Sequence, residues 1–338
     1  MMGHTLSERE LISRIRRQAN RTDQGLVKGI GDDCAVLRNA ENRLSLITTD
    51  ALVESVHFDI SWHPPFLLGR KTASVNISDI AAMGGIPRFV LLAMAVPAVV
   101  ESEWLTGFLD GFLSVLDEQG AVLIGGDTVR STGPIVCSVT VLGEGDKDRI
   151  LYRHSAQVGD LIWVSGTLGD AAAGLAMFSS IVRRPSALTE WPELCKAHLD
   201  PTAEVELGLL LAVSGLVHAM MDISDGLATD LAHICEESRV GAQVFAEQIP
   251  ISDQLVAASR ELAVLPLDWA LRGGEDYHLL FTASSTVGER LEKLVYEKMG
   301  KAIYCVGRIV EGNGVALFNS GKSQEIAFGG FDHFARHG

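Results

Sequence analysis

The chain has 338 residues, of which 47% are hydrophobic and 21% are charged, and its formal net charge is −15. These values are typical of a globular protein with two domains, and the negative charge argues against a nucleic-acid-binding protein. Its apolar segments are shorter than the roughly 18 residues of a membrane span, and Met1 to Arg17 lacks the apolar region of a secretory signal.

The N-terminal half predicts a series of helices and strands. Ser7 and Glu10 form a capping box, which starts a helix that extends to about Ala19. Apolar residues at helical spacing form its expected core stripe, namely Leu11, Ile12 and Ile15. A glycine-rich loop (25–33) then leads into a strand. A strand is predicted over 44–47, ending in Thr48-Thr49-Asp50, and extended chain over 53–58. The other predicted elements of this half are helices over 67–83 and 101–118 and strands over 88–96, 121–124 and 134–144.

The helix over 67–83 carries polar residues that its apolar surroundings do not favour. Asn76 and Asp79 lie three positions apart, and therefore on one face of a helix rich in Ala, Ile and Met. Gly84 and Gly85 are its expected stop. A carboxylate in such a helix is costly to bury unless a cation or a metal neutralises it. Because segment 76–85 contains no Lys or Arg, Asp79 is a candidate metal ligand.

The polar run 143–148 is expected to link two domains, 1–146 and 147–338. The second domain is predicted to contain strands over 161–164, 217–221 and 279–282 and helices over 203–213, 227–237 and 289–298. Helices and strands alternate in both halves, so the expected fold class is α/β (α+β). The five cysteines occur singly, which argues against a zinc site or a disulfide framework and favours a reducing cytoplasm.

Further acidic residues share one pattern, an Asp beside Gly, Ser or Thr at the predicted end of an element. They lie at Asp32-Asp33, Asp50, Asp127 and the pair Asp222 and Asp225. Five such points, Asp79 included, cannot neutralise one another if the fold brings them together. The natural partners are then several divalent cations and a polyphosphate, since Mg²⁺ prefers hydroxyl and carboxylate oxygens. The glycines at 125–126 would let a phosphate approach the backbone N–H groups.

In their order and number these motifs resemble those of the thiamine-monophosphate kinase family, within the aminoimidazole-ribonucleotide-synthetase-like superfamily. The resemblance runs from the Gly-Ile-Gly-Asp-Asp motif at 29–33 to Phe-Asp-His-Phe at 331–334. Asn-x-Ser-Asp-x-x-Ala-Met-Gly (76–84) and Asp-x-Ser-Asp-Gly (222–226) are its strongest single motifs. Two others, Thr-Thr-Asp-x-Leu-Val-x-x-x-His-Phe (48–58) and Gly-Gly-Glu-Asp-Tyr (273–277), favour the kinase over its relatives.

The resemblance implies that the chain transfers a phosphoryl group from ATP to thiamine monophosphate, giving thiamine diphosphate and ADP. This is the last step of thiamine diphosphate biosynthesis. No general base is expected, because the acceptor is an ionised phosphate and metal-assisted positioning carries the transfer. The implied Mg²⁺ ligands are Asp33, Thr48, Thr49, Asp50, Asp79, Asp127, Asp222 and Asp225. The implied ATP-binding residues are Gly126, Asp127, Arg153 and Ser224, and the implied substrate-binding residues are His57, Glu275 and Phe331.

The resemblance also implies a homodimer, in which the N-terminal mixed sheets form a shared barrel and an α/β domain lies behind each. The strands over 89–96 and 135–142 lack the polar alternation of a solvent-facing sheet, which agrees with a covered face. Two alternatives stay open. One is another ATP-using enzyme of the superfamily, of the hydrogenase-maturation dehydratase or purine cyclo-ligase type. The other is a non-catalytic nucleotide- or metal-binding regulator.

Overall fold

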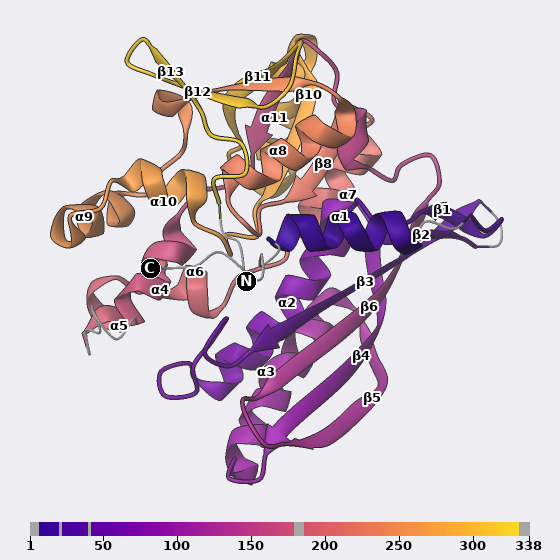
Figure 1. Ribbon diagram of the computed structural model, residues 1–338, viewed down its shortest axis with the longest axis vertical. Coiled ribbons are helices and arrows are strands. Elements are labelled where there is room, and N and C mark those ends of the chain that lie inside the picture. Colours follow the sequence, from indigo (N-terminus) through magenta and orange to yellow (C-terminus); the bar gives the residue numbers. More distant parts are fainter. Residues whose placement is uncertain (1–6, 20–21, 40–41, 179–185, 331–338) are drawn as a thin grey trace, which may run out of the picture.

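The computed structural model describes residues 7–19, 22–39, 42–178 and 186–330, which form two mixed α/β domains, each built on one sheet. In Figure 1 the first sheet lies in the lower half of the molecule and the strands of the second in the upper half. Helix α2 (Pro65–Ala82) runs between them. None of the helices in the described residues is long and apolar enough to cross a membrane.

The first sheet has six strands in the order β1-β2-β3-β6-β4-β5. Only β4 and β5 pair in parallel; the other neighbours are antiparallel. Helices α2 and α3 pack on one face, here called the inner face, and the opposite face is called the outer face. The elements are β1 (Leu26–Lys28), β2 (Ala35–Arg38), β3 (Arg43–Val53), β4 (Ile86–Pro97), α3 (Ser102–Gln119), β5 (Val122–Ser131) and β6 (Val136–Asp146).

The second sheet has seven strands in the order β13-β12-β9-β11-β7-β10-β8, and helices cover both of its faces. Helices α8 and α10 share a core with Ile162 and Val164, while α7 and α11 pack on the face that carries Trp163. The strands are β7 (Asp160–Val164), β8 (Val217–Asp222), β9 (Gly241–Phe245), β10 (Leu279–Ser284), β11 (Tyr304–Val310), β12 (Val315–Asn319) and β13 (Lys322–Glu325). The helices are α4 (Asp170–Phe178), α5 (Ala187–Glu190), α6 (Pro192–Leu199), α7 (Val205–Ser214), α8 (Leu227–Ser238), α9 (Asp253–Leu262), α10 (Pro266–Arg272) and α11 (Gly288–Met299).

Helix α2 is buried along most of its length because both domains pack against it. Close helix contacts need small residues. A Cβ on Gly69 would lie 1.9 Å from the carbonyl oxygen of Phe108 on α3, and a Cβ on Gly208 of α7 would lie 2.1 Å from that of Ala81. The helix ends as predicted at Gly84, which has a φ of 67° and donates its N–H to the carbonyl of Ala81.

The N-terminal helix α1 (Glu8–Ala19) has the predicted capping box, in which the backbone N–H of Glu10 donates to Ser7 Oγ at 3.3 Å. The predicted core stripe is wrong, because the stripe is exposed to solvent. The helix is held at the molecular surface by ion pairs of its arginines with α8 rather than by a buried apolar face. The exposed residues are Leu11, Ile12 and Ile15, at 36%, 47% and 46%.

Two strands are longer than the sequence predicts. Strand β3 continues through Thr48-Thr49-Asp50 to Val53, and β5 continues through Gly125-Gly126-Asp127 to Ser131. The prediction placed these polar motifs at strand ends because Gly and Asp are rare inside strands. Pairing of β3 with β6 over its whole length, and of β5 with β4, outweighs that preference. The polar residues therefore lie within the strands and not at their ends.

Candidate active site

Three carboxylates from distant parts of the chain meet at the C-terminal end of α2. Asp79 lies in the last turn of this helix, Asp33 in the loop before β2, and Asp222 at the end of β8. One carboxylate oxygen of each lies within 4.8 Å of the others. Asp33 and Asp222 are buried, and Asp79 is partly buried. The structure thus brings together three of the predicted metal ligands.

Neighbouring hydroxyl groups orient two members of this carboxylate cluster. Thr48 Oγ1 donates to Asp79 Oδ2, and Ser78 Oγ donates to Asp222 Oδ2 at 2.6 Å. Because Ser78 and Asp79 are adjacent on α2, one turn of this helix fixes side chains from both domains. The contacts of Ser78 and Asp79 therefore explain why the Asn-x-Ser-Asp motif has a serine and an aspartate at these two positions.

The electrostatics of the cluster are unfavourable without a cation. Burial, followed by the charges of Asp222, Asp50 and Asp33, raises the pKa of Asp79 well above its usual value. Burial and Asp33 likewise raise the pKa of Asp222 to about 7. Burial also raises the pKa of Asp33, although the Arg153 guanidinium opposes this rise. Groups that repel in this way are the donor set that a divalent cation stabilises.

The consecutive residues Thr48, Thr49 and Asp50 divide between the two faces of the first sheet, because side chains alternate along a strand. Thr48 and Asp50 lie on the inner face, and the backbone N–H of Asp50 donates to the Asn76 side chain at 3.0 Å. Thr49 lies on the outer face, where the Thr140 hydroxyl donates to its Oγ1 at 3.0 Å. The structure does not bring Thr49 to the carboxylate cluster.

Gly126 and Asp127 lie in the middle of β5, the edge strand of the first sheet. Gly126 has a φ of 156°, and a Cβ there would lie 1.8 Å from the carbonyl oxygen of Leu92, so no larger residue fits. Asp127 stands opposite Ala93 on β4, and three strand spacings, or about 14 Å, separate β5 from β3. Within a single chain Asp127 is not a member of the carboxylate cluster of Asp33, Asp79 and Asp222.

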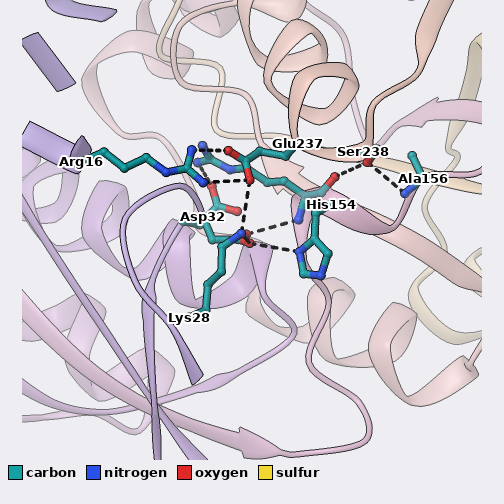
Figure 2. Close-up of polar contacts among 9 residues, drawn as sticks. Arg16, Lys28, Asp32, His154, Ala156, Glu237 and Ser238 are labelled. Atoms are coloured by element: carbon teal, nitrogen blue, oxygen red, sulfur yellow. Dashed lines mark hydrogen bonds and ion pairs between the residues drawn. The ribbon is translucent and has the colours of Figure 1, made fainter. Parts of the chain in front are cut away.

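Figure 2 shows how the loop before β2 is anchored to α8. Lys28 Nζ lies 3.3 Å from Asp32 Oδ2 and 3.4 Å from Glu237 Oε2, and Arg16 of α1 pairs with the same Glu237. The backbone N–H of Arg153 donates to Asp32 Oδ1 at 3.2 Å. Asp32 thus has an ion pair with Lys28 and a hydrogen bond from the Arg153 backbone, so Asp32 acts as an anchor for the loop.

Arg153, an implied ATP-binding residue, lies at the carboxylate cluster itself. Its guanidinium donates to Oδ1 of Asp33. Among the described residues the other oxygen, Oδ2, is buried and has no hydrogen-bond partner. A buried carboxylate oxygen without a donor is the group that a metal ion would satisfy.

Ser224 and Asp225 lie in the loop after β8, which pairs with segment 273–277. The backbone N–H of Glu275 donates to the Ser224 carbonyl at 2.7 Å, and that of Tyr277 donates to the Ile223 carbonyl at 2.8 Å. The two loops therefore form one unit beside the carboxylate cluster. Asp225 belongs to this unit and is partly buried.

Glu275 is held by two buried groups that sequence reasoning missed. Lys71 Nζ lies 2.8 Å from Glu275 Oε1, and His198 Nδ1 lies 3.0 Å from Oε2. Their partner is far away in the sequence, which explains the omission. The sequence feature that could have pointed to this pair is Lys71, a lysine on an apolar helix. It lies two turns before Asp79 and on the same side of the helix.

His57 lies in a turn after β3, where the sequence had predicted extended chain. Ser55 has a φ of 67°, and the backbone N–H of His57 donates to the Val53 carbonyl at 2.9 Å. The N–H of Val53 in turn donates to His57 Nδ1 at 3.0 Å, so the proton of a neutral ring is on Nε2. The third implied substrate residue, Phe331, lies outside the described residues.

Comparison with known proteins identifies the family. AIR synthase related protein, N-terminal domain, matches residues 31–144, and AIR synthase related protein, C-terminal domain, matches residues 157–319. Thiamine-monophosphate kinase of Haemophilus influenzae is 38% identical over 97% of this chain and 98% of its own length. The chain belongs to the thiamine-monophosphate kinase family. The resemblance inferred from the motifs is thereby confirmed.

Solved structures agree with this membership of the thiamine-monophosphate kinase family. One described as AaThiL complexed with AMPPCP and TMP has a TM-score of 0.86 and 32% identity, and covers 99% of this chain and 100% of its own. Thiamine-monophosphate kinase from Stenotrophomonas maltophilia K279a has a TM-score of 0.75 and 40% identity, and covers 92% of this chain and 96% of its own. Hydrogenase maturation protein HypE, at 17% identity and a TM-score of 0.69, shares the fold.

Proposed function

We propose that this protein phosphorylates thiamine monophosphate with ATP, giving thiamine diphosphate and ADP. The observation that carries the proposal is the carboxylate cluster of Asp33, Asp79 and Asp222, within 4.8 Å of one another in a chain of this family. Phosphoryl transfer depends on positioning and on neutralisation of phosphate charge. A cluster of repelling acids beside a basic side chain, Arg153, suits that task.

Mg²⁺ fits this site by two observations. Asp33 Oδ2 is buried without a hydrogen-bond partner among the described residues, and the pKa values of Asp79 and Asp222 are raised by burial and by mutual repulsion. The residues that would hold the ions on the inner side of the sheet are Asp33, Thr48, Asp50, Asp79, Asp222 and Asp225. When bound there, Mg²⁺ would neutralise negative charge on the phosphate groups.

The chain's own residues bind and orient the two substrates. For ATP we propose Gly126, Asp127, Arg153 and Ser224, of which Arg153 supplies a fixed positive charge at the cluster. For thiamine monophosphate we propose His57, Glu275 and Phe331. Because the acceptor phosphate is already ionised, no side chain is assigned as a general base.

The proposed assembly is a homodimer through the outer face of the first sheet, with a shared barrel. Thr49 and Asp127, which are also proposed Mg²⁺ ligands, lie on that face or at its edge and would be enclosed by the second copy. Domain division at 146/147 is supported by the end of β6 at Asp146. All five cysteines are free, which suits the reducing cytoplasm that we propose as the protein's location.

The deciding experiment measures ADP release from ATP and Mg²⁺ against a panel of acceptors. Thiamine monophosphate is expected to stimulate ADP release, and thiamine or other monophosphates are not. ADP release that depends on a different acceptor would favour another enzyme of the superfamily. Binding of ATP without acceptor-dependent turnover would favour a regulator.

A further inference from the structure

Between α2 and α6 the structure encloses a second polar cluster, formed by Lys71, His198 and Glu275. It is separate from the carboxylate cluster of Asp33, Asp79 and Asp222. Lys71 and His198 are each 0% exposed. Lys71 Nζ lies 2.8 Å from Oε1 of Glu275, and His198 Nδ1 lies 3.0 Å from Oε2, so each carboxylate oxygen lies beside its own basic group. His63 packs beside them, with its ring 6.2 Å from that of His198.

The charges of this cluster balance. Burial, and then the Lys71 ammonium, lower the pKa of His198, so its ring is neutral at neutral pH. Burial alone would raise the pKa of Glu275, but Lys71, and His198 after it, hold that pKa well below its usual range. The Glu275 carboxylate is therefore ionised, and the positive charge that stabilises it comes from Lys71.

The backbone around Glu275 is strained and held on several sides. Glu275 has a φ of 70°, in the left-handed region, and its N–H donates to the Ser224 carbonyl at 2.7 Å. The next side chain, Asp276, accepts from the backbone N–H groups of Gly169 at 2.8 Å and Ala171 at 3.3 Å. Such a conformation persists only where the surroundings fix it, and it is commonly found at ligand sites.

Lys71 also sets the position of Glu275 relative to the carboxylate cluster. Lys71 and Asp79 lie eight residues apart on α2, which corresponds to about 12 Å along the helix axis. The helix between them is buried from Lys71 to Ser78, so this spacing is rigid. We infer that Lys71 is a positioning residue, which holds the Glu275 carboxylate ionised and at a fixed distance from Asp79. The inference rests on the proposed function, in which Glu275 binds the thiamine part of the substrate.

The test compares Lys71→Met with Arg70→Met. Arg70 is the neighbouring residue on α2 and also joins the two domains, because its Nε lies 2.8 Å from Asp200 Oδ1. Lys71→Met is expected to raise the KM for thiamine monophosphate about tenfold or more, while kcat and the KM for ATP change by less than about threefold. Arg70→Met removes an ion pair between the domains without touching Glu275, and it is expected to leave that KM near the wild-type value.

A double variant covers the case in which Lys71→Met does not fold because Glu275 is left buried without a cation. Lys71→Met/Glu275→Gln removes both charges. If Lys71 acts through Glu275, the double variant has the same KM for thiamine monophosphate as Glu275→Gln alone. A further increase in that KM in the double variant would overturn the inference.

Three other outcomes would also count against it. An unchanged KM in a folded Lys71→Met protein, or an equal rise in Arg70→Met, would overturn the inference and leave the proposed function standing. A wild-type protein that releases no ADP with thiamine monophosphate would instead overturn the proposed function, and the inference with it.

Discussion

The carboxylates of Asp33, Asp79 and Asp222 determine the charge of this site and its expected affinity for a cation. Asp33, Asp79 and Asp222 come from three separate segments, and only the folded chain brings their oxygens within 4.8 Å. The sequence could predict their chemical role, because each Asp stands beside small or hydroxyl residues or on an otherwise apolar helix. It could not predict that Lys71 pairs with Glu275, since nothing in the local pattern of either residue specifies its partner.

Substitution of Asp79 tests the carboxylate cluster directly. Asp79→Asn keeps the shape of the side chain but removes a charge that is repelled in the metal-free protein. In EDTA the variant is therefore expected to melt at or above the wild-type temperature and to gain less from Mg²⁺ with ATP. Loss of a preorganised electrostatic contact should lower kcat by about 10²–10³. Calorimetry and the ADP assay measure the two effects.

The matched control for this substitution is Asp117→Asn, at an exposed position near the end of α3. It is expected to leave both melting temperature and turnover near wild type. Near-normal turnover of Asp79→Asn at millimolar Mg²⁺ would show instead that Asp79 is a structural carboxylate.

The pKa of Asp222 predicts how metal-free stability depends on pH. The folded-state pKa is about 7 and the ordinary value is 3.8, so between these values the folded state binds more protons than the unfolded state. Asp222 should therefore contribute a fall in the stability of the metal-free protein as pH rises from about 4 to about 7. Asp222→Asn should make this fall shallower.

Melting temperatures measured from pH 4 to pH 8 in EDTA would test this. Asp148→Asn, at an exposed position after β6, serves as the control and should keep the wild-type slope. An Asp222→Asn protein with the same pH dependence of the metal-free melting temperature as the wild type would contradict the raised pKa of Asp222.

At the scale of elements, periodicity and turn residues predict most helices and strands of the first domain, and in the second domain the strands β7, β8 and β10 and the helices α7, α8 and α11. Helix α2, for example, was predicted at 67–83 and is observed at Pro65–Ala82. The continuation of β3 and β5 through their polar motifs was not predicted, because local propensity carries no information about the strand that pairs alongside. The exposure of the α1 stripe was not predicted for a similar reason, since periodicity shows an apolar face but not what covers it.

The crossing of α2 and α3 gives a prediction at this scale. On α3, a Cβ at Gly111 would lie 1.8 Å from the carbonyl oxygen of Phe66, whereas a Cβ at Gly107 would have its nearest contact at 3.4 Å. Gly111→Ala should force the helices apart and destabilise the protein by about 1–3 kcal/mol. Gly107→Ala, one turn earlier, should be neutral or stabilising by up to about 1 kcal/mol.

Chemical denaturation of both variants measures this difference in the free energy of unfolding. Equal stability of Gly111→Ala and Gly107→Ala would mean that the two helices can separate without loss, and that their close approach is not needed for folding.

At the scale of the whole molecule, one face of the first sheet is unusually apolar for a surface. Strand β5 is an unpaired edge, and β4 alternates buried residues on its inner face with exposed ones on its outer face. Exposed apolar side chains of these two strands are Phe89, Leu91, Val122, Ile124 and Val129, at 43%, 37%, 55%, 54% and 52%. An exposed apolar patch with a free strand edge is typical of a subunit interface.

The mass in solution tests the proposed homodimer. Light scattering at micromolar concentration should give twice the chain mass of 36.3 kDa. Val122→Glu places a charge on the apolar face and should shift the protein to monomer. Tyr296→Glu, at a 68% exposed position on α11, should remain dimeric. A monomeric wild-type mass would disprove the dimer.

The burial of α2 between the two sheets also bears on how the chain is made. The ribosome delivers the first 146 residues before any strand of the second sheet exists, and at that stage the side of α2 that later meets α7 and β8 faces water. An apolar helix in that condition cannot complete its packing and exposes a surface to which other unfinished chains adhere. The N-terminal half thus reaches its final state only when the C-terminal half has emerged, so the two domains are separate in architecture but interdependent in biogenesis.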